Sequence, residues 1–196
     1  MTVAIVLASS STYRRQLLER LRLPFEAVAP AVDETFGAGE TPTQIARRLA
    51  LLKAEAVAAR YPDAIVIGSD QVAEMNGRPI GKPLAHEAAL DQLLAMQGRS
   101  VVFYTALALV RAAAGYKRVE CVDTQVRFRR LPRETLDAYL RLEQPYDCAG
   151  SAKVESLGIC LVESVRSNDP TALIGLPLIS LTSMLADCGV ALPPVT

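Results

Sequence analysis

The chain has 196 residues, about the length of one domain, and 51% of them are apolar. That apolar share excludes a disordered chain. Equal numbers of basic and acidic residues, 21 of each, leave no net charge to attract nucleic acid or an anionic membrane. Because the four cysteines form no CxxC pair and no apolar run suits a signal peptide or a membrane span, we expect reduced thiols in a cytoplasmic protein. We expect a single domain, residues 1–196, with neither a nucleic-acid nor a membrane partner.

Apolar runs alternate with amphipathic segments along the chain, a pattern typical of the α/β class. In the first half, this pattern predicts strands at 3–8, 25–29 and 64–68, and helices at 12–21 and 42–60. Ser11 is the expected N-cap of the first helix, and Thr41 with Gln44 forms a capping box at the start of the second.

In the second half, Asn76-Gly77 predicts a type I′ turn within a hairpin at 72–80. We expect helices at 87–97, 132–142 and 178–188, a long antiparallel strand pair at 101–110 and 118–128, and a strand at 158–165. Because hairpins are mixed with helical crossovers, the central sheet should contain both parallel and antiparallel strands.

The first candidate site is the hydroxyl-rich turn between the first strand and the first helix. Free backbone N–H groups at a helix start favour a bound phosphate, and Ser11, Arg14 and Arg15 would add further donors. An ordinary serine N-cap beside two solvated arginines is the alternative. A second polar segment, residues 150–155, precedes the last expected strand and could face the same pocket.

Acidic and basic side chains stand at the ends of other expected elements. Asp33-Glu34 follows the second strand and could bind a divalent cation. Asp70 follows the buried third strand, where it could bind a metal or activate water. These acids could instead be ordinary turn residues. Lys53 falls in the apolar row of its helix, and its charge either reaches the helix edge or points into a site.

The position of Lys82 relative to Asp70 is open. If the hairpin turn has two residues, Lys82 lies opposite Gln71, and regular pleating would place it on the other face of the sheet from Asp70. Pro79 and Gly81 indicate instead that the strand register breaks before that point. The sequence does not decide between these two arrangements.

Together, these segments resemble the Maf family of nucleotide pyrophosphatases. The matching segments occur in the family's order and spacing, and they are Leu7-Ala8-Ser9 through Arg14-Arg15, Val32-Asp33-Glu34, Lys53, Gly68-Ser69-Asp70, Gly81-Lys82-Pro83 and Gly158-Ile159. The resemblance implies an elongated α/β fold with a mixed central sheet flanked by helices, similar to inosine triphosphate pyrophosphatases. It also implies cleavage of a nucleoside triphosphate between the α- and β-phosphates with a divalent cation, Mg²⁺ or Mn²⁺. Thr12 stands where the family commonly has proline, which should change only the helix start.

The resemblance suggests roles for individual residues. Asp70 would be the catalytic base, and Glu34 with Asp70 would bind the metal. The residues expected to bind the substrate phosphates are Ser11, Arg14, Arg15, Lys53 and Lys82. A homodimer is compatible with the sequence, which does not fix the oligomeric state.

Within the family, Tyr13, Gln71 and Glu155 resemble the subgroup that hydrolyses 7-methyl-GTP, whereas the dTTP/UTP subgroup has Arg, Thr and Gln at these places. N7-methylation makes guanine cationic, so an aromatic ring could stack on the base and a carboxylate could pair with it. The alternatives are a pyrophosphatase that prefers dTTP or UTP, and a nucleotide-binding regulator of cell division or septum formation without turnover. A nucleotidyltransferase is disfavoured because its phosphate loop needs glycines, and Ser9-Ser10-Ser11 supplies none.

Overall fold

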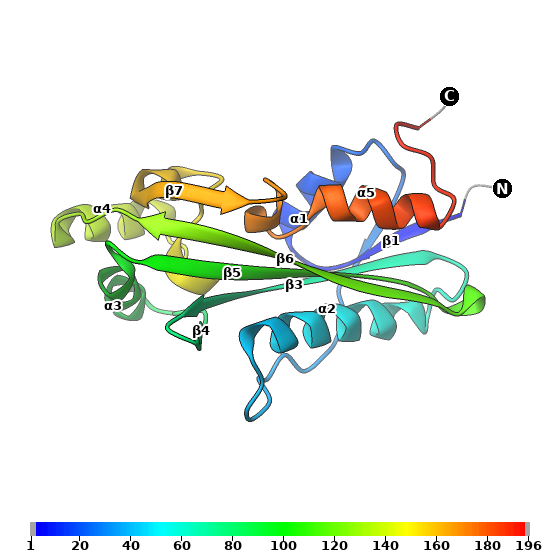
Figure 1. Cartoon of the computed structure of the whole chain (residues 1–196), viewed down its shortest axis with the longest axis horizontal. Helices are drawn as coiled ribbons and strands as arrows, with labels where there is room; N and C mark the ends of the chain where they lie inside the picture. The colour runs from blue at the N-terminus through cyan, green and yellow to red at the C-terminus, as the bar shows by residue number, and fades with distance from the viewer. Residues whose placement is uncertain (1–2, 195–196) are drawn as a thin grey trace.

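The computed structural model describes residues 3–194, whose elements are labelled in Figure 1. The helices are α1 (Thr12–Glu19), α2 (Pro42–Ala58), α3 (His86–Met96), α4 (Arg133–Glu143) and α5 (Leu178–Asp187). The strands are β1 (Ile5–Ala8), β2 (Glu26–Val28), β3 (Ile65–Met75), β4 (Arg78–Ile80), β5 (Ser100–Arg111), β6 (Tyr116–Phe128) and β7 (Val162–Ser167). Short 3₁₀ helices are η1 (Ala112–Ala114), η2 (Ala149–Ser151), η3 (Leu157–Leu161) and η4 (Ala172–Ile174).

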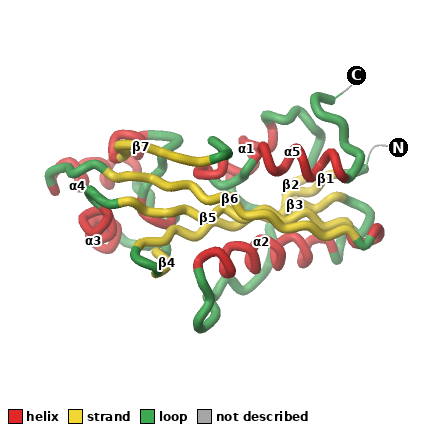
Figure 2. The backbone as a smooth tube through the Cα atoms, in the orientation of Figure 1, coloured by secondary structure: helices red, strands yellow, loops and turns green. Residues whose placement is uncertain are grey.

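The strands form a seven-stranded sheet in the order β2-β1-β3-β5-β6-β7, with β4 beside β3. β1 runs parallel to β2 and β3, whereas β5 is antiparallel to β3 and β6, and β6 is antiparallel to β7. The prediction of a mixed sheet in an α/β fold is therefore confirmed. The long strands β3, β5 and β6 span the molecule and give it an elongated shape, with α2 below the sheet and α1 and α5 above it (Figure 2).

The hydrophobic core consists of three clusters around this sheet. One lies between α2 and the sheet, and a second packs α1 and α5 against β1, β3 and β5. The third lies between the helices α3 and α4 and the strands β5, β6 and β7. The two clusters under α1/α5 and α3/α4 stabilise opposite ends of the long strands (Figure 1). Among residues 3–194, no helix has the length and apolar character needed to cross a membrane.

The longest helix, α2, packs closely against β3. Its N-terminus carries the expected capping box, in which the side chains of Thr41 and Gln44 each accept a hydrogen bond from the other's backbone N–H. Gly68 on β3 makes the close contact possible, since a Cβ atom there would lie 2.2 Å from the backbone oxygen of Ala50. Lys53 belongs to the buried residues of this helix, so the tight packing brings a lysine to the middle of β3.

One edge of β3 is interrupted halfway along the strand. β1 pairs with residues 65–68 of β3, and β4 pairs with residues 73–75. The opposite edge is occupied by β5, which pairs with residues 66–74. Within the described part of the chain, residues 69–72 therefore have no strand beside them on the first edge, and Asp70 lies in this gap.

Two elements differ from the sequence predictions. β3 is one strand of 11 residues, so Asp70 lies inside a strand, and the expectation that it follows a strand end was wrong. The ladder with β5 extends the strand past the point where local sequence suggests a break. Residues 158–161 form a 3₁₀ helix instead of the expected strand, and β7 begins only at Val162. Gly158 packs there directly on the backbone of Lys153, where a Cβ atom would lie 2.5 Å from its oxygen.

Candidate active site

The side chain of Lys53 joins two carboxylates in the gap beside β3. Its Nζ atom lies 2.6 Å from Oδ1 of Asp70 and 2.9 Å from Oε1 of Glu34. Lys53 and Asp70 are buried, with only 5% and 7% of their surface exposed, whereas the Glu34 side chain is 48% exposed. The charge of Lys53 therefore points into a polar site rather than to the edge of its helix.

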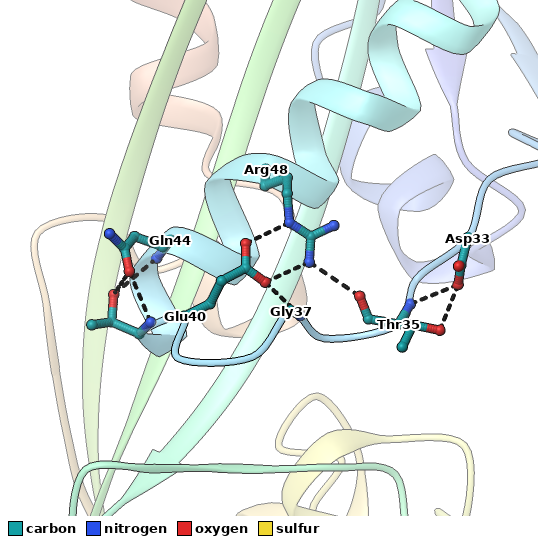
Figure 3. Close-up of polar contacts among 7 residues, drawn as sticks. Asp33, Thr35, Gly37, Glu40, Gln44 and Arg48 are labelled. Carbon is teal, nitrogen blue, oxygen red and sulfur yellow. Dashed lines mark hydrogen bonds and ion pairs between the residues drawn. The ribbon is translucent and has the colours of Figure 1, made fainter.

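The loop that carries Glu34 is held against α2 by the polar contacts in Figure 3. Arg48 on α2 donates two hydrogen bonds to the Glu40 carboxylate, at 2.6 and 2.7 Å, and one to the carbonyl oxygen of Thr35, at 3.1 Å. Glu40 also accepts a hydrogen bond from the backbone N–H of Gly37. The helix that carries the buried lysine thus also fixes this loop, and no sequence pattern had indicated the Arg48 contacts.

Asp33, the neighbour of Glu34, is used within its own turn. Its Oδ1 atom accepts hydrogen bonds from the backbone N–H of Thr35 at 2.9 Å and from the Thr35 hydroxyl at 2.6 Å. These two hydrogen bonds, the side-chain one first, hold the pKa of the Asp33 carboxyl below its usual range. Of the two adjacent acids, the structure brings Glu34 to the buried lysine and keeps Asp33 in the turn.

Two further cations, Arg14 and Lys82, act on Glu34. Burial raises the pKa of Glu34, but the hydrogen bond and charge of Lys53, with the charges of Lys82 and Arg14, lower it, and the net pKa lies below its usual value. Burial lowers the pKa of the Arg14 guanidinium, while the charges of Asp70 and Glu34 act in the opposite direction. Lys82, exposed just beyond β4, therefore contributes to the lowered pKa of Glu34.

The turn after β1 delivers Arg14 to this cluster. Ser11 caps α1 as predicted, with its Oγ accepting a hydrogen bond from the backbone N–H of Arg14 at 3.4 Å. The Nε–H of Arg14 donates to the carbonyl oxygen of Gly175 at 2.9 Å. Arg15 is exposed, and its Nε lies 3.2 Å from Oε1 of Glu19 on the same helix. The structure thus brings Arg14 among the site charges and leaves Arg15 in a surface ion pair.

Two of the three residues expected to read the base belong to one neighbourhood. The Nζ atom of Lys153 lies 6.0 Å from the centre of the Tyr13 ring, which links the turn after β1 to the polar segment at 150–155. Glu155 follows in that segment, with part of the residue exposed and its carboxyl partly surrounded by protein. Partial burial of the Glu155 carboxyl is the largest of the effects on its pKa and raises it above its usual value. Lys153 is an additional charged group at this end of the site.

Gln71 is held by a turn that the sequence patterns did not reveal. Its Nε2 atom lies 2.9 Å from Oγ1 of Thr105, 3.1 Å from the carbonyl oxygen of Ala172 and 3.0 Å from that of Leu173. The amide nitrogen is therefore engaged with η4, and Oε1 is the atom left for a ligand. Gly175, which ends this turn, and Asn168-Asp169-Pro170, which precedes it, were the sequence signals that could have marked it.

The residues at the gap suit a divalent cation that arrives with a phosphate ligand. Glu34 and Asp70 lie on either side of the Lys53 ammonium, so two carboxylates share one small region. Among residues 3–194, no group of three or more histidine, cysteine, aspartate or glutamate side chains could hold a metal on its own. Mg²⁺ is commonly bound by one or two carboxylates together with waters and substrate phosphates. The donor set therefore fits such an ion, with Glu34 and Asp70 as its protein ligands.

Comparisons with known proteins identify the relatives of this chain. A family model described as Maf-like protein matches residues 4–188. A 7-methyl-GTP pyrophosphatase of Ralstonia nicotianae is 60% identical over 181 residues, which cover 92% of this chain and 93% of that protein. Another, of Cupriavidus metallidurans, is 57% identical over 186 residues, covering 95% and 94%. The solved structure of the Staphylococcus aureus Ham1 protein aligns with a TM-score of 0.46 at 21% identity, covering 64% of this chain and 71% of that one. Since the family model spans most of its length, the chain belongs to the Maf family.

Proposed function

We propose that this chain hydrolyses 7-methyl-GTP to 7-methyl-GMP and pyrophosphate, and so removes a modified nucleotide. One observation carries the proposal: the Lys53 ammonium contacts both Glu34 and Asp70, Arg14 interacts electrostatically with both carboxylates, and Lys82 interacts with Glu34. Three cations around two carboxylates suit a triphosphate that binds with its metal ion. The names of the relatives that are 60% and 57% identical support 7-methyl-GTP as the substrate.

The triphosphate would lie across the turn after β1. Ser11 and Arg14 would bind phosphate oxygens there. Arg15 would bind at the outer end of the turn once its surface ion pair with Glu19 has broken. Lys53 and Lys82 would neutralise the β- and γ-phosphates. Most of the rate gain would then come from positioning the substrate and stabilising the charge that develops in the transition state.

Asp70 is the proposed general base. Its carboxylate takes the proton from a water whose oxygen attacks the α-phosphorus, and the bond from that phosphorus to the bridging oxygen breaks, so pyrophosphate leaves. Lys53 orients the carboxylate through the contact of 2.6 Å. Glu34 and Asp70 would hold Mg²⁺ or Mn²⁺, which when bound withdraws charge from the phosphate oxygens.

Recognition of the base is assigned to Tyr13, Glu155 and Gln71. The Tyr13 ring can stack on the cationic 7-methylguanine, and Glu155 can pair with its charge or with its N–H donors. Gln71 would contribute through Oε1, since its Nε2 is engaged with η4.

In the same proposal, residues 1–196 form one catalytic domain that acts on free nucleotides in the cytoplasm. The domain works as a monomer or a homodimer, and it needs neither a nucleic acid nor a membrane.

The test is a panel of triphosphates incubated with the protein and Mg²⁺, with pyrophosphate release as the readout. We expect the highest kcat/KM for 7-methyl-GTP among 7-methyl-GTP, GTP, dTTP and UTP. A higher value for dTTP or UTP would move the chain to the pyrimidine-preferring subgroup. Binding of triphosphates without any pyrophosphate release would instead support a regulator without turnover.

A further inference from the structure

The turn formed by η4 and Gly175 is tied to the middle of the sheet. The Oγ atom of Ser69 on β3 lies 2.9 Å from the carbonyl oxygen of Gly175 and 2.8 Å from that of Ala106 on β5, and its single proton is shared between these two acceptors. Oγ1 of Thr105 on β5 donates to the carbonyl oxygen of Ala172 at 2.8 Å. Both hydroxyl residues are completely buried. Because buried hydroxyls need hydrogen-bond partners, these contacts fix the turn against the two strands.

The carbonyl oxygen of Gly175 also accepts the Nε–H of Arg14, at 2.9 Å. One backbone oxygen therefore faces both a buried serine of the sheet and the arginine expected to bind phosphate. Within residues 3–194, Nε is the only guanidinium atom of Arg14 that donates a hydrogen bond. The two terminal nitrogens stay available for bidentate contact with a phosphate.

Gly175 also lies directly against the Arg14 side chain. A Cβ atom at this position would come within 3.4 Å of Nε and 3.7 Å of Cγ of Arg14. The φ angle of Gly175 is +120°, which side chains other than that of glycine rarely adopt. Gly175 therefore supplies the hydrogen-bond acceptor of the arginine from a backbone conformation that favours glycine.

We propose that Ser69 and Gly175 are positioning residues that hold Arg14 ready for the substrate phosphates. The inference rests on the proposed function, in which Arg14 binds a phosphate oxygen. Fixing Nε to a backbone oxygen removes rotamer freedom from a long side chain before the substrate arrives, and correct placement of such a group has a large effect on rate. Ser69 touches no reacting atom and acts through the Gly175 carbonyl.

A double-mutant cycle tests this role through kcat and KM with 7-methyl-GTP and with UTP. Arg14→Ala should lower kcat/KM about 10²–10³-fold. Ser69→Ala should lower it about 10-fold, and by the same factor for both substrates, because the phosphates are common to them. In the Arg14→Ala background, Ser69→Ala should change kcat/KM by less than about 2-fold, because the residue through which it acts is gone.

Several outcomes separate the inference from the function on which it rests. Absence of pyrophosphate release by the wild-type protein would refute the proposed function itself. An active wild type in which the Ser69 and Arg14 effects multiply would refute the positioning role alone. Ser183→Ala is the matched control, since its hydroxyl also bonds a backbone oxygen but lies on the exposed face of α5; it should leave kcat/KM unchanged.

If Ser69→Ala fails to fold, Gly175→Ala replaces it in the same cycle. Alanine is strained at a φ of +120°, so the backbone there should shift and move the carbonyl oxygen that holds Arg14; the resulting loss of kcat/KM should also disappear in the Arg14→Ala background. Thermal unfolding of each variant shows whether the fold is kept. Unfolding of both variants would overturn the proposal, because the carbonyl would then serve the fold rather than the arginine.

Discussion

The Nζ atom of Lys53 lies 2.6 Å from Oδ1 of Asp70, and both side chains are almost fully enclosed by α2 and the sheet. Two opposite charges removed from water stay ionised only when each compensates the other. The pair exists because Gly68 lets α2 approach β3 closely enough for a helical lysine to reach a strand carboxylate. The close packing of α2 on β3 and the ion pair of the candidate active site therefore both depend on the contact at Gly68.

Asp70→Asn should reduce turnover by at least about 10²–10³-fold, since the amide cannot accept the proton of the attacking water. The substitution keeps the size of the side chain, so the fold should survive. Steady-state kinetics with 7-methyl-GTP and thermal unfolding check the two parts. Asp91→Asn, on the exposed side of α3, is the control and should keep full activity. Wild-type activity in Asp70→Asn would remove Asp70 from the role of base.

Lys53→Met should destabilise the fold by about 3 kcal/mol, because it leaves the Asp70 carboxylate buried without a cation. Mg²⁺ or Mn²⁺ should then raise Tm more in the variant than in the wild type, since the two carboxylates lose their bound ammonium. Urea unfolding and thermal shift measure these effects. Lys117→Met removes an exposed pair with Glu55 and should change stability by less than about 1 kcal/mol. Equal shifts of Tm with metal in Lys53→Met and wild type would contradict a shared carboxylate site.

The pH dependence of stability should depend on Glu34. Its pKa in the folded state lies below its usual value of 4.5, so ionised Glu34 adds stability that is present above that pH and is lost as pH falls through the folded pKa. Glu34→Gln should therefore be less stable than the wild type at about pH 7, with the difference shrinking at about pH 3.5. Urea unfolding with a chelator present measures both points. A stability difference of the same size at both pH values would refute the prediction.

Glu155→Gln combined with Gln71→Thr should shift preference from 7-methyl-GTP toward dTTP and UTP. Loss of the carboxylate weakens pairing with a cationic base. The threonine cannot reproduce the amide contacts with Ala172 and Leu173, so some activity should be lost with every substrate. The ratio of kcat/KM values for 7-methyl-GTP and dTTP is therefore the quantity to measure. An unchanged ratio would show that these residues do not read the base.

Gly68→Ala should destabilise the protein by more than about 2 kcal/mol, because its Cβ atom would meet the backbone of α2 at 2.2 Å. Gly81→Ala is the matched control, since a Cβ atom there meets no atom within 4 Å and the backbone has no positive φ. Chemical unfolding of both variants checks the prediction. Similar stability of the two variants would mean that α2 and β3 have room to separate.

Local signals in the sequence predicted the elements whose geometry depends on neighbouring residues. Asn76 and Gly77 adopt φ angles of 56° and 77°, and Met75 pairs with Arg78, so the predicted two-residue type I′ turn is confirmed. The capping box of α2 is also confirmed. These features arise from side chains a few residues apart, which the sequence displays directly.

Features set by distant contacts could not be predicted in the same way. The regular register of the hairpin ends at Ile80, so pleating did not determine where Lys82 lies, and its effect on Glu34 depends on a loop after β4. The site contact of Arg14 with Gly175 joins residues 161 positions apart. No pattern within one element contains that information, and only the folded sheet brings the two segments together.

The interruption opposite residues 69–72 of β3 has a consequence for solubility. Peptide groups exposed along a strand edge commonly recruit another chain and start aggregation. Here the unpaired stretch is bounded by β1 on one side and β4 on the other, so a foreign strand finds no continuous ladder to extend. The same stretch is buried, since Ser69, Asp70 and Val72 are at most 7% exposed, so the surrounding segments shield it further from another chain.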